Sequence, residues 1–100
     1  MNWNEISNAA IVETIGKRLK EYRLKKRYSQ KELAMRAGIS LFTVAQIERG
    51  NPVSIAMWVP VLRVLRLLDN LEMLLPDIAI SPVEILKLKG KKPQRIRVKK

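Results

Sequence analysis

The 100-residue sequence contains no cysteine and no histidine. Without cysteine no disulfide can form, which fits a reducing compartment. The lack of both residue types also removes the most frequent zinc ligands and the commonest general base. We therefore expect no metal site, no cofactor and no catalytic residues, and the composition argues against an enzyme.

Long hydrophobic runs are missing as well. The longest apolar stretch, residues 55–68, is interrupted by Pro60, Arg63 and Arg66. It is too short and too charged to span a bilayer. The N-terminus shows no basic stretch followed by an apolar one, so no export signal is predicted. These features predict a cytoplasmic protein that does not use a membrane as its partner.

Acidic residues are scarce, nine against twenty Lys and Arg, and the formal net charge is +11. The excess is uneven, because residues 87–100 hold eight basic side chains and no acid, whereas residues 51–86 hold four acids and two arginines. A chain this basic suits a polyanion, either nucleic acid or an anionic membrane.

The remaining pattern predicts an all-helical domain. Apolar residues recur mainly at spacings of three and four in the first part of the chain, which indicates an amphipathic helix from about residue 8 to residue 27. Its opposite face is basic and is either solvated or turned toward a polyanion. The apolar positions are Ile11, Ile15, Leu19, Tyr22 and Leu24, and the basic ones include Lys17, Lys20 and Lys25.

Two short helices follow, joined by three residues. Ser29 and Glu32 have the spacing of a capping box, in which each side chain serves a backbone amide of the other, so a helix begins at residue 30. Gly38 ends it, because glycine adopts left-handed backbone angles easily. Ser40 caps a helix over residues 41–48, which Gly50 ends.

The sequence after residue 50 predicts further short helices. Ser54 caps a helix to about residue 65, in which Pro60 predicts a kink or a late start near the proline. A second capping box at residues 69–72 begins a fifth helix that ends at Pro76, and residues 81–88 form a last helical piece. We divide the chain into a domain of residues 1–76 and, over residues 77–100, a short helix with a basic tail.

Val44 and Ile47 face inward in this arrangement, which leaves Leu41, Phe42 and Gln46 outward. Apolar groups beside a glutamine suit a DNA groove, because they contact thymine methyls while the amide bonds adenine. Segments 29–34, 37–40 and 43–51 closely resemble the helix-turn-helix of phage repressors and Cro (XRE family), and the resemblance extends over about residues 15–68. It implies a compact bundle of about five short helices, as in lambda repressor.

The resemblance also implies a function and a set of roles. The chain is expected to be a nucleoid-associated transcriptional regulator of bacterial or phage origin that binds a palindromic double-stranded DNA operator as a homodimer. Leu41, Phe42 and Gln46 match positions that contact base edges. Arg23 and Glu48 match a buried structural ion pair. The positions that match phosphate-contacting or positioning residues are Gln30, Ser40, Thr43, Arg49 and Asn51.

Three features depart from the family or leave alternatives open. Relatives commonly have polar residues at positions 41 and 42 and glycine at position 66, so DNA shape is expected to supply part of the specificity. The C-terminal leucines either close the core or form a dimer contact; they are Leu67, Leu68, Leu71, Leu74 and Leu75. The tail from Lys87 is a solvated segment, a DNA arm or a segment that orders on a protein.

The alternative to a plain repressor is an antitoxin. The leucine-rich fifth helix, the Ser81-Pro82 segment and the basic tail are similar to antitoxins that bind HipA-type kinase toxins and repress their own promoter. A protein adaptor that does not bind DNA and a membrane-active helix are weaker alternatives, because neither explains the helix-turn-helix together with its basic surroundings.

Overall fold

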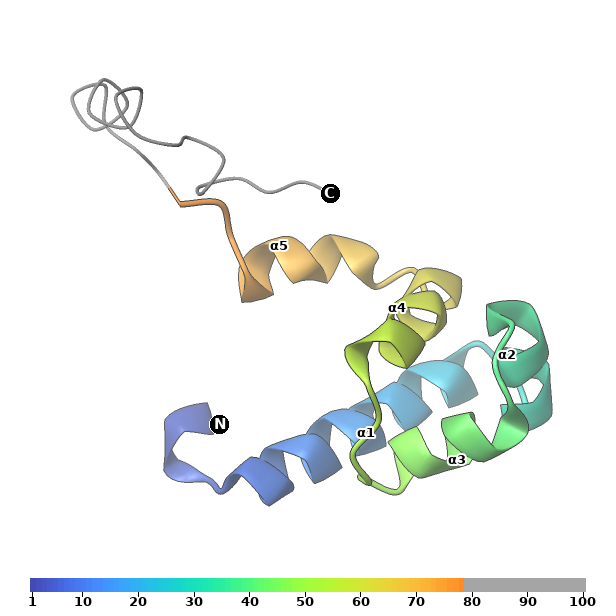
Figure 1. Ribbon diagram of the computed structural model, residues 1–100, viewed down its shortest axis with the longest axis horizontal. Coiled ribbons are helices and arrows are strands. Elements are labelled where there is room, and N and C mark those ends of the chain that lie inside the picture. Colours follow the sequence, from blue (N-terminus) through green and yellow to red (C-terminus); the bar gives the residue numbers. More distant parts are fainter. Residues whose placement is uncertain (79–100) are drawn as a thin grey trace.

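A computed structural model describes residues 1–78, and all of its regular elements are helical (Figure 1). The predicted last helical piece and the basic tail lie outside the described residues. There are two short 3-10 helices in this part of the chain, η1 (Trp3–Glu5) before the first α-helix and η2 (Leu68–Asn70) directly before the last. The α-helices are α1 (Asn8–Lys25), α2 (Gln30–Ala37), α3 (Leu41–Glu48), α4 (Ile55–Val64) and α5 (Leu71–Leu74).

The core lies between the first four α-helices, where α1 packs on α3, and α2 packs on both α3 and α4. Each helix supplies one or two side chains that are almost fully buried. Burying such an aliphatic side chain contributes roughly 1.5–3 kcal/mol. The buried set is Leu19, Leu33, Ala34, Val44, Ile47, Val61 and Leu65.

Side-chain caps begin three of these helices. The hydroxyls of Ser7, Ser29 and Ser40 accept hydrogen bonds from the amides of Ala10, Glu32 and Thr43, at 3.1, 3.0 and 3.0 Å. Each bond satisfies an amide that has no partner within the helix. The predicted starts of α1 at about residue 8, of α2 at residue 30 and of α3 at residue 41 are therefore confirmed.

Two predicted capping boxes are wrong in part or in whole. The Glu32 carboxylate does not return to the cap but accepts from the Arg36 guanidinium at 3.0 and 3.1 Å, since that cation lies one turn ahead on the same face. In the second box, α5 begins at Leu71 after a 3-10 turn, and no side chain caps it. A tight 3-10 turn satisfies the first amides instead.

The fourth helix runs without a break from Ile55 to Val64 and includes Pro60, so a late start near the proline is wrong. The fixed φ of proline fits a helix, and its ring removes one bond to the carbonyl of Ala56. Ala56 itself is an exposed residue. Ser54 stands at the N-cap position but makes no side-chain cap bond.

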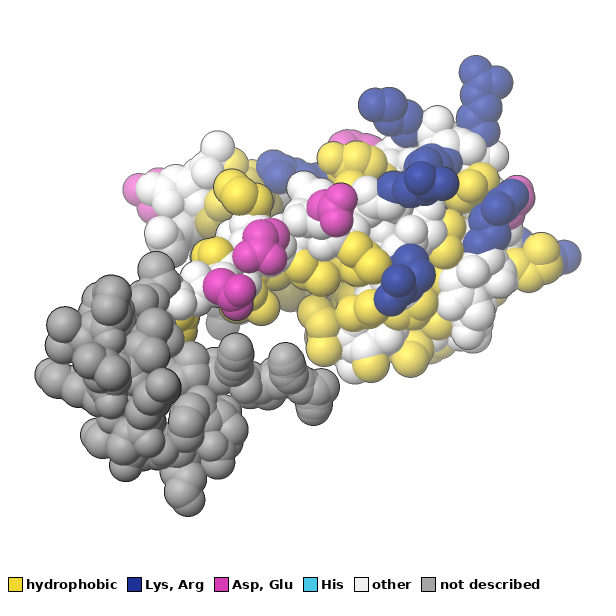
Figure 2. Space-filling view, turned by 90° about the horizontal axis from the view of Figure 1, so that it is seen from above, with side chains coloured by type: hydrophobic (Ala, Val, Ile, Leu, Met, Phe, Trp, Pro, Cys, Tyr) yellow, Lys and Arg dark blue, Asp and Glu magenta, His cyan; other side chains and the backbone are white. Residues whose placement is uncertain are grey.

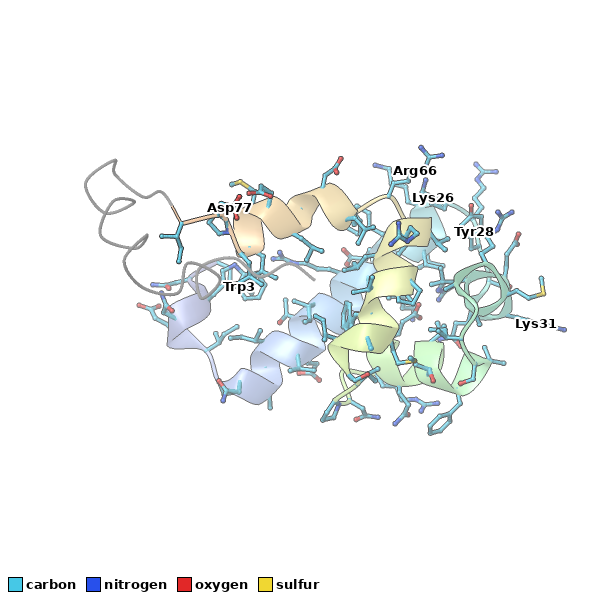
Figure 3. All side chains as sticks on the ribbon, turned by 45° about the horizontal axis from the view of Figure 1, so that its top comes forward. Trp3, Lys26, Tyr28, Lys31, Arg66 and Asp77 are labelled. Atoms are coloured by element: carbon cyan, nitrogen blue, oxygen red, sulfur yellow. The ribbon has the colours of Figure 1, made fainter. Side chains whose placement is uncertain are left out.

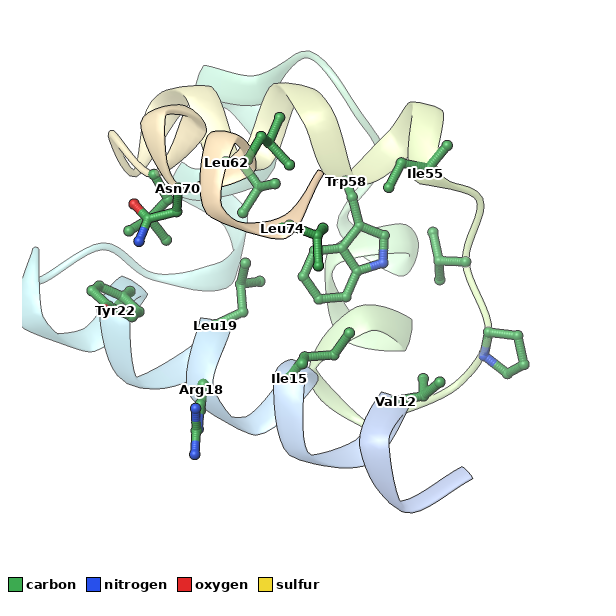
Figure 4. Close-up of a pocket in the computed structure, with 14 residues that line it drawn as sticks. Val12, Ile15, Arg18, Leu19, Tyr22, Ile55, Trp58, Leu62, Asn70 and Leu74 are labelled. Atoms are coloured by element: carbon green, nitrogen blue, oxygen red, sulfur yellow. The ribbon is translucent and has the colours of Figure 1, made fainter. Parts of the chain in front are cut away.

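The first helix ends two residues before the predicted boundary, because Arg27 adopts left-handed backbone angles with φ 62°. Its apolar side is also less buried than its spacing predicted. Leu19 is buried, whereas Ile15, Tyr22 and Leu24 are 37, 45 and 53% exposed. The space beside α1 is only partly covered by α4 and α5, which leaves an open groove (Figure 4).

Candidate DNA-binding surface

The turn between α2 and α3 holds the two helices at a fixed angle. Gly38 has φ 73°, and its amide donates to the carbonyl of Ala34 at 2.9 Å. The amide of Ile39 donates to the same carbonyl at 3.1 Å, which closes the end of α2. Ala34 is only 4% exposed, and its small side chain allows α2 and α3 to cross closely.

The inner and outer sides of α3 differ sharply in burial. Val44 and Ile47 are 0 and 1% exposed and fix the helix to the core. Leu41 and Phe42 are 47 and 69% exposed in the first turn of the same helix. Two large apolar side chains in water are unfavourable unless a partner covers them. The outer side of α3 therefore has the composition of a contact surface.

Gln46 lies one turn after Phe42 and is engaged in the free protein. The Arg49 guanidinium donates to its side-chain oxygen at 2.7 Å. The backbone carbonyl of Gln46 also accepts a hydrogen bond from the backbone amide of Asn51 at 3.0 Å, which fixes the loop after α3. The remaining Gln46 Nε2 can still donate. A bidentate bond to adenine uses both the oxygen and the nitrogen of the amide, so Arg49 would have to release Gln46 or turn with it.

The predicted phosphate-contacting residues surround this helix. Ser40 and Thr43 share a hydroxyl hydrogen bond of 2.8 Å at the start of α3, and Arg49 is exposed at its end. The backbone amides of Gly50 and Asn51 donate to carbonyls of Ile47 and Gln46 at 3.1 and 3.0 Å. Because these two amides are occupied, phosphate contacts near Gly50 and Asn51 would have to come from side chains.

A buried polar network joins α1, α2 and α3. The Nε and Nη2 atoms of Arg23 donate to the two carboxylate oxygens of Glu48 at 2.6 and 3.0 Å. Arg23 Nη1 donates to the carbonyl of Tyr28 at 2.8 Å, and Gln30 Nε2 donates to Glu48 at 3.0 Å. The side chains of Arg23 and Glu48 are 7 and 3% exposed. The Gln30 side chain thus braces the end of α3.

Two residues of this region were missed in the sequence. A Cβ at Gly16 would collide with the carbonyl oxygen of Ile47, so α1 and α3 touch here through backbone. Glycine within a helical pattern is a known sign of such close contact. Tyr28 supplies the carbonyl for Arg23, and its ring lies 4.6 Å from the Arg36 guanidinium carbon, an arrangement set by the turn between α1 and α2 that no sequence motif indicates.

Among residues 1–78 no cluster of three or more His, Cys, Asp or Glu side chains could hold a metal ion. No helix in this part of the chain combines the length and the apolar character needed to cross a bilayer.

A family model described as helix-turn-helix matches residues 19–68, half of the chain. The matched segment includes the end of α1 and the whole of α2, α3 and α4. A comparison with curated proteins found no match. The family consists of DNA-binding regulatory domains. The chain therefore belongs to the Cro/C1-type (XRE) helix-turn-helix family and is a DNA-binding transcription regulator of that type.

Proposed function

We propose that this protein is an operator-specific repressor that places α3 in the major groove of double-stranded DNA. One observation carries the proposal: the outer side of α3 exposes Leu41 and Phe42 beside Gln46, while its inner side is locked in the core. A helix so fixed can present side chains to base edges without losing further freedom.

The roles follow from the chemistry of each side chain. Leu41 and Phe42 contact thymine methyl groups, and Gln46 bonds adenine. Few direct hydrogen bonds are left, so sequence-dependent DNA shape supplies the rest of the specificity. The side chains that contact or approach phosphate are Gln30, Ser40, Thr43, Arg49 and Asn51.

Replacing Gln46 with alanine is expected to weaken binding to the preferred site by roughly 1–3 kcal/mol and to relax the preference at one base pair. Fluorescence anisotropy with the preferred duplex and its single-base variants measures both effects. Lys20→Ala, on the basic side of α1, is the control, and should leave the order of preference among these duplexes unchanged. Equal preferences for Gln46→Ala and the unchanged protein would rule out a base contact by this residue.

We also propose that the regulator acts as a homodimer. A groove of about 630 Å³ runs between α1, α4 and α5, with Trp58 on its wall and Ile15 and Tyr22 on its floor (Figure 4). Leu67, Leu68 and Leu71 are half-buried, but Leu74 and Leu75 are 66 and 77% exposed. Exposed leucines beside an apolar groove favour a second copy of the chain over simple closure of the core.

Leu74→Glu is expected to convert a dimer to a monomer, because a carboxylate would be buried in the contact without a partner. Sedimentation velocity measures the change, and affinity for a two-half-site duplex should fall by at least about tenfold, since the two half-sites are no longer linked. Leu24 is also exposed but lies outside the groove, so Leu24→Glu should change neither the sedimentation coefficient nor the affinity for this duplex. An unaltered sedimentation coefficient for Leu74→Glu would contradict the proposed contact.

A second candidate is an antitoxin that binds a HipA-like kinase and represses its own promoter. It is favoured by the same α5 surface, where Met73, Leu74 and Leu75 are exposed next to one another. Apolar patches of this kind are typical of protein contacts. A kinase reading frame beside the gene whose product co-purifies with this chain would support the antitoxin, and its absence from the purified complex would leave the plain repressor.

A further inference from the structure

Five basic side chains gather at the C-terminal ends of α1 and α4, and we name them the terminal basic cluster. All five are exposed. Lys26 and Arg66 lie at the same end of the molecule (Figure 3), and Tyr22 and Leu67, each close to one of these ends, line the same groove. The cluster consists of Lys25, Lys26, Arg27, Arg63 and Arg66.

Two members of the cluster occupy backbone positions that suit glycine. Arg27 and Arg66 have φ 62° and 61°, the region that Gly38 and Gly50 also adopt. Each follows a helix whose end is closed by a backbone hydrogen bond that spans five residues. The amide of Tyr28 donates to the carbonyl of Arg23 at 3.2 Å, and the amide of Leu67 donates to the carbonyl of Leu62 at 2.8 Å. The fold requires only this backbone conformation, which glycine reaches without strain. What the arginine adds at each position is an exposed cation.

Nothing in the described part of the chain neutralises the cluster. Within residues 1–78 the ion pairs are Arg23 with Glu48 and Arg36 with Glu32, so no carboxylate there lies within 4.0 Å of a cluster cation. Helix C-terminal ends do favour cations in the last turn, where Lys25 and Arg63 lie, but this effect is small at exposed positions and is screened by salt. Five neighbouring cations repel one another, and a polyanion such as DNA relieves the repulsion best.

The end of α4, which carries Arg63 and Arg66, lies on the side of the bundle opposite the proposed groove-binding helix. In Figure 1, α3 lies along the lower edge of the bundle, whereas the end of α4 lies above it. Figure 2 views the molecule from above, and Lys and Arg side chains gather on that face over the same end, with acidic side chains along the other side. A straight duplex that lies along α3 is therefore not expected to pass over the end of α4 and its two arginines.

We propose that the terminal basic cluster is a second DNA-binding surface, which holds the phosphate backbone of a second duplex without regard to sequence. The inference rests on the proposed binding of a first duplex through α3. Lys and Arg bind phosphate without base contacts, and this term is sequence-independent. One molecule then bridges two DNA segments, which brings distant sites together when it binds its operator.

The test is a capture assay with the full-length protein and two short duplexes of unrelated sequence, one biotin-labelled and one fluorescent. The unchanged protein is expected to retain the fluorescent duplex on streptavidin beads carrying the other. Arg27→Gly with Arg66→Gly should reduce capture by about tenfold, because two phosphate contacts are lost. Its thermal midpoint should not fall, since glycine suits both backbone positions, so misfolding does not explain the loss.

The control is Arg27→Lys with Arg66→Lys, which keeps both charges and should retain capture within about twofold. Anisotropy with one duplex separates the two proposals. Binding of one duplex without capture of the second overturns only the bridging surface, whereas absence of any binding overturns the proposed function as well. If the double-glycine variant captures as much DNA as the unchanged protein, another part of the protein bridges the duplexes. If the variant loses binding to one duplex as strongly as it loses capture, the cluster belongs to the same site as α3. Either result contradicts the proposal.

Discussion

Replacing Glu48 with alanine is expected to lower the free energy of unfolding by roughly 3–5 kcal/mol. The Glu48 carboxylate accepts two bonds from Arg23 and one from Gln30, and its side chain is only 3% exposed. Without it, the buried guanidinium keeps only the carbonyl of Tyr28. Urea unfolding followed by circular dichroism measures the loss, which is a large part of a typical stability of about 5–15 kcal/mol.

The chain supplies a matched control in its other ion pair. Glu32 and Arg36 are 40 and 50% exposed, so Glu32→Ala should cost no more than about 1 kcal/mol. Replacing Arg23 and Glu48 together with leucine should cost less than the two single changes combined, because neither charge is then left unpaired. If Glu48→Ala were as mild as Glu32→Ala, the network would not hold α3 to α1.

Gly16→Ala is expected to destabilise the protein by about 2–3 kcal/mol, although alanine is the better helix former. The added methyl would collide with the carbonyl oxygen of Ile47 and lie 3.3 Å from the amide nitrogen of Gly50. Both obstacles are backbone atoms, so α1 and α3 would have to move apart. Thermal unfolding measures the effect, and binding to DNA should weaken too, since the end of α3 shifts.

Gly38→Ala is the comparison for that prediction. Gly38 has φ 73° and nothing within 4 Å of an added Cβ, so only the backbone conformation opposes alanine there. The expected loss is about 1 kcal/mol. A larger loss at Gly38 than at Gly16 would show that the contact between α1 and α3 is looser than described.

Most of the fold was predictable because its boundaries are set by local chemistry. A serine hydroxyl reaches the amide three residues ahead whatever the rest of the chain does, and Ser29 and Ser40 therefore mark the starts of α2 and α3. The left-handed turn at Gly38 is equally local. Together these signals predicted both helices of the motif.

Other features depend on neighbours that are distant in sequence. Ile15 and Tyr22 are exposed because α5 covers α1 only in part. The spacing of apolar residues along α1 cannot predict how far another helix covers it. The Glu32 carboxylate bonds Arg36 in place of the capping amide, a choice between two local partners that helix propensities do not decide. The left-handed Arg27 went against residue preference, so the end of α1 was placed too late.

The site was predicted unevenly for the same reason. The ion pair of Arg23 and Glu48 was named from the family resemblance, and the structure contains that contact. The exposure of Leu41 and Phe42 follows from helical periodicity once Val44 and Ile47 are placed inside. The bond between Arg49 and Gln46 and the occupied amides after α3 depend on side-chain and loop geometry, which no pattern in the sequence contains.

Selection of bound sites from random duplex DNA tests the central proposal most directly. It is run in parallel with the unchanged protein and with Phe42→Ala combined with Gln46→Ala. We expect the unchanged protein to enrich one sequence motif, repeated symmetrically if it binds as a dimer. The variant, which keeps its phosphate-contacting side chains, should bind random DNA with nearly the same affinity but lose or change that motif. Enrichment of the same motif to the same degree by both proteins would contradict base recognition by α3.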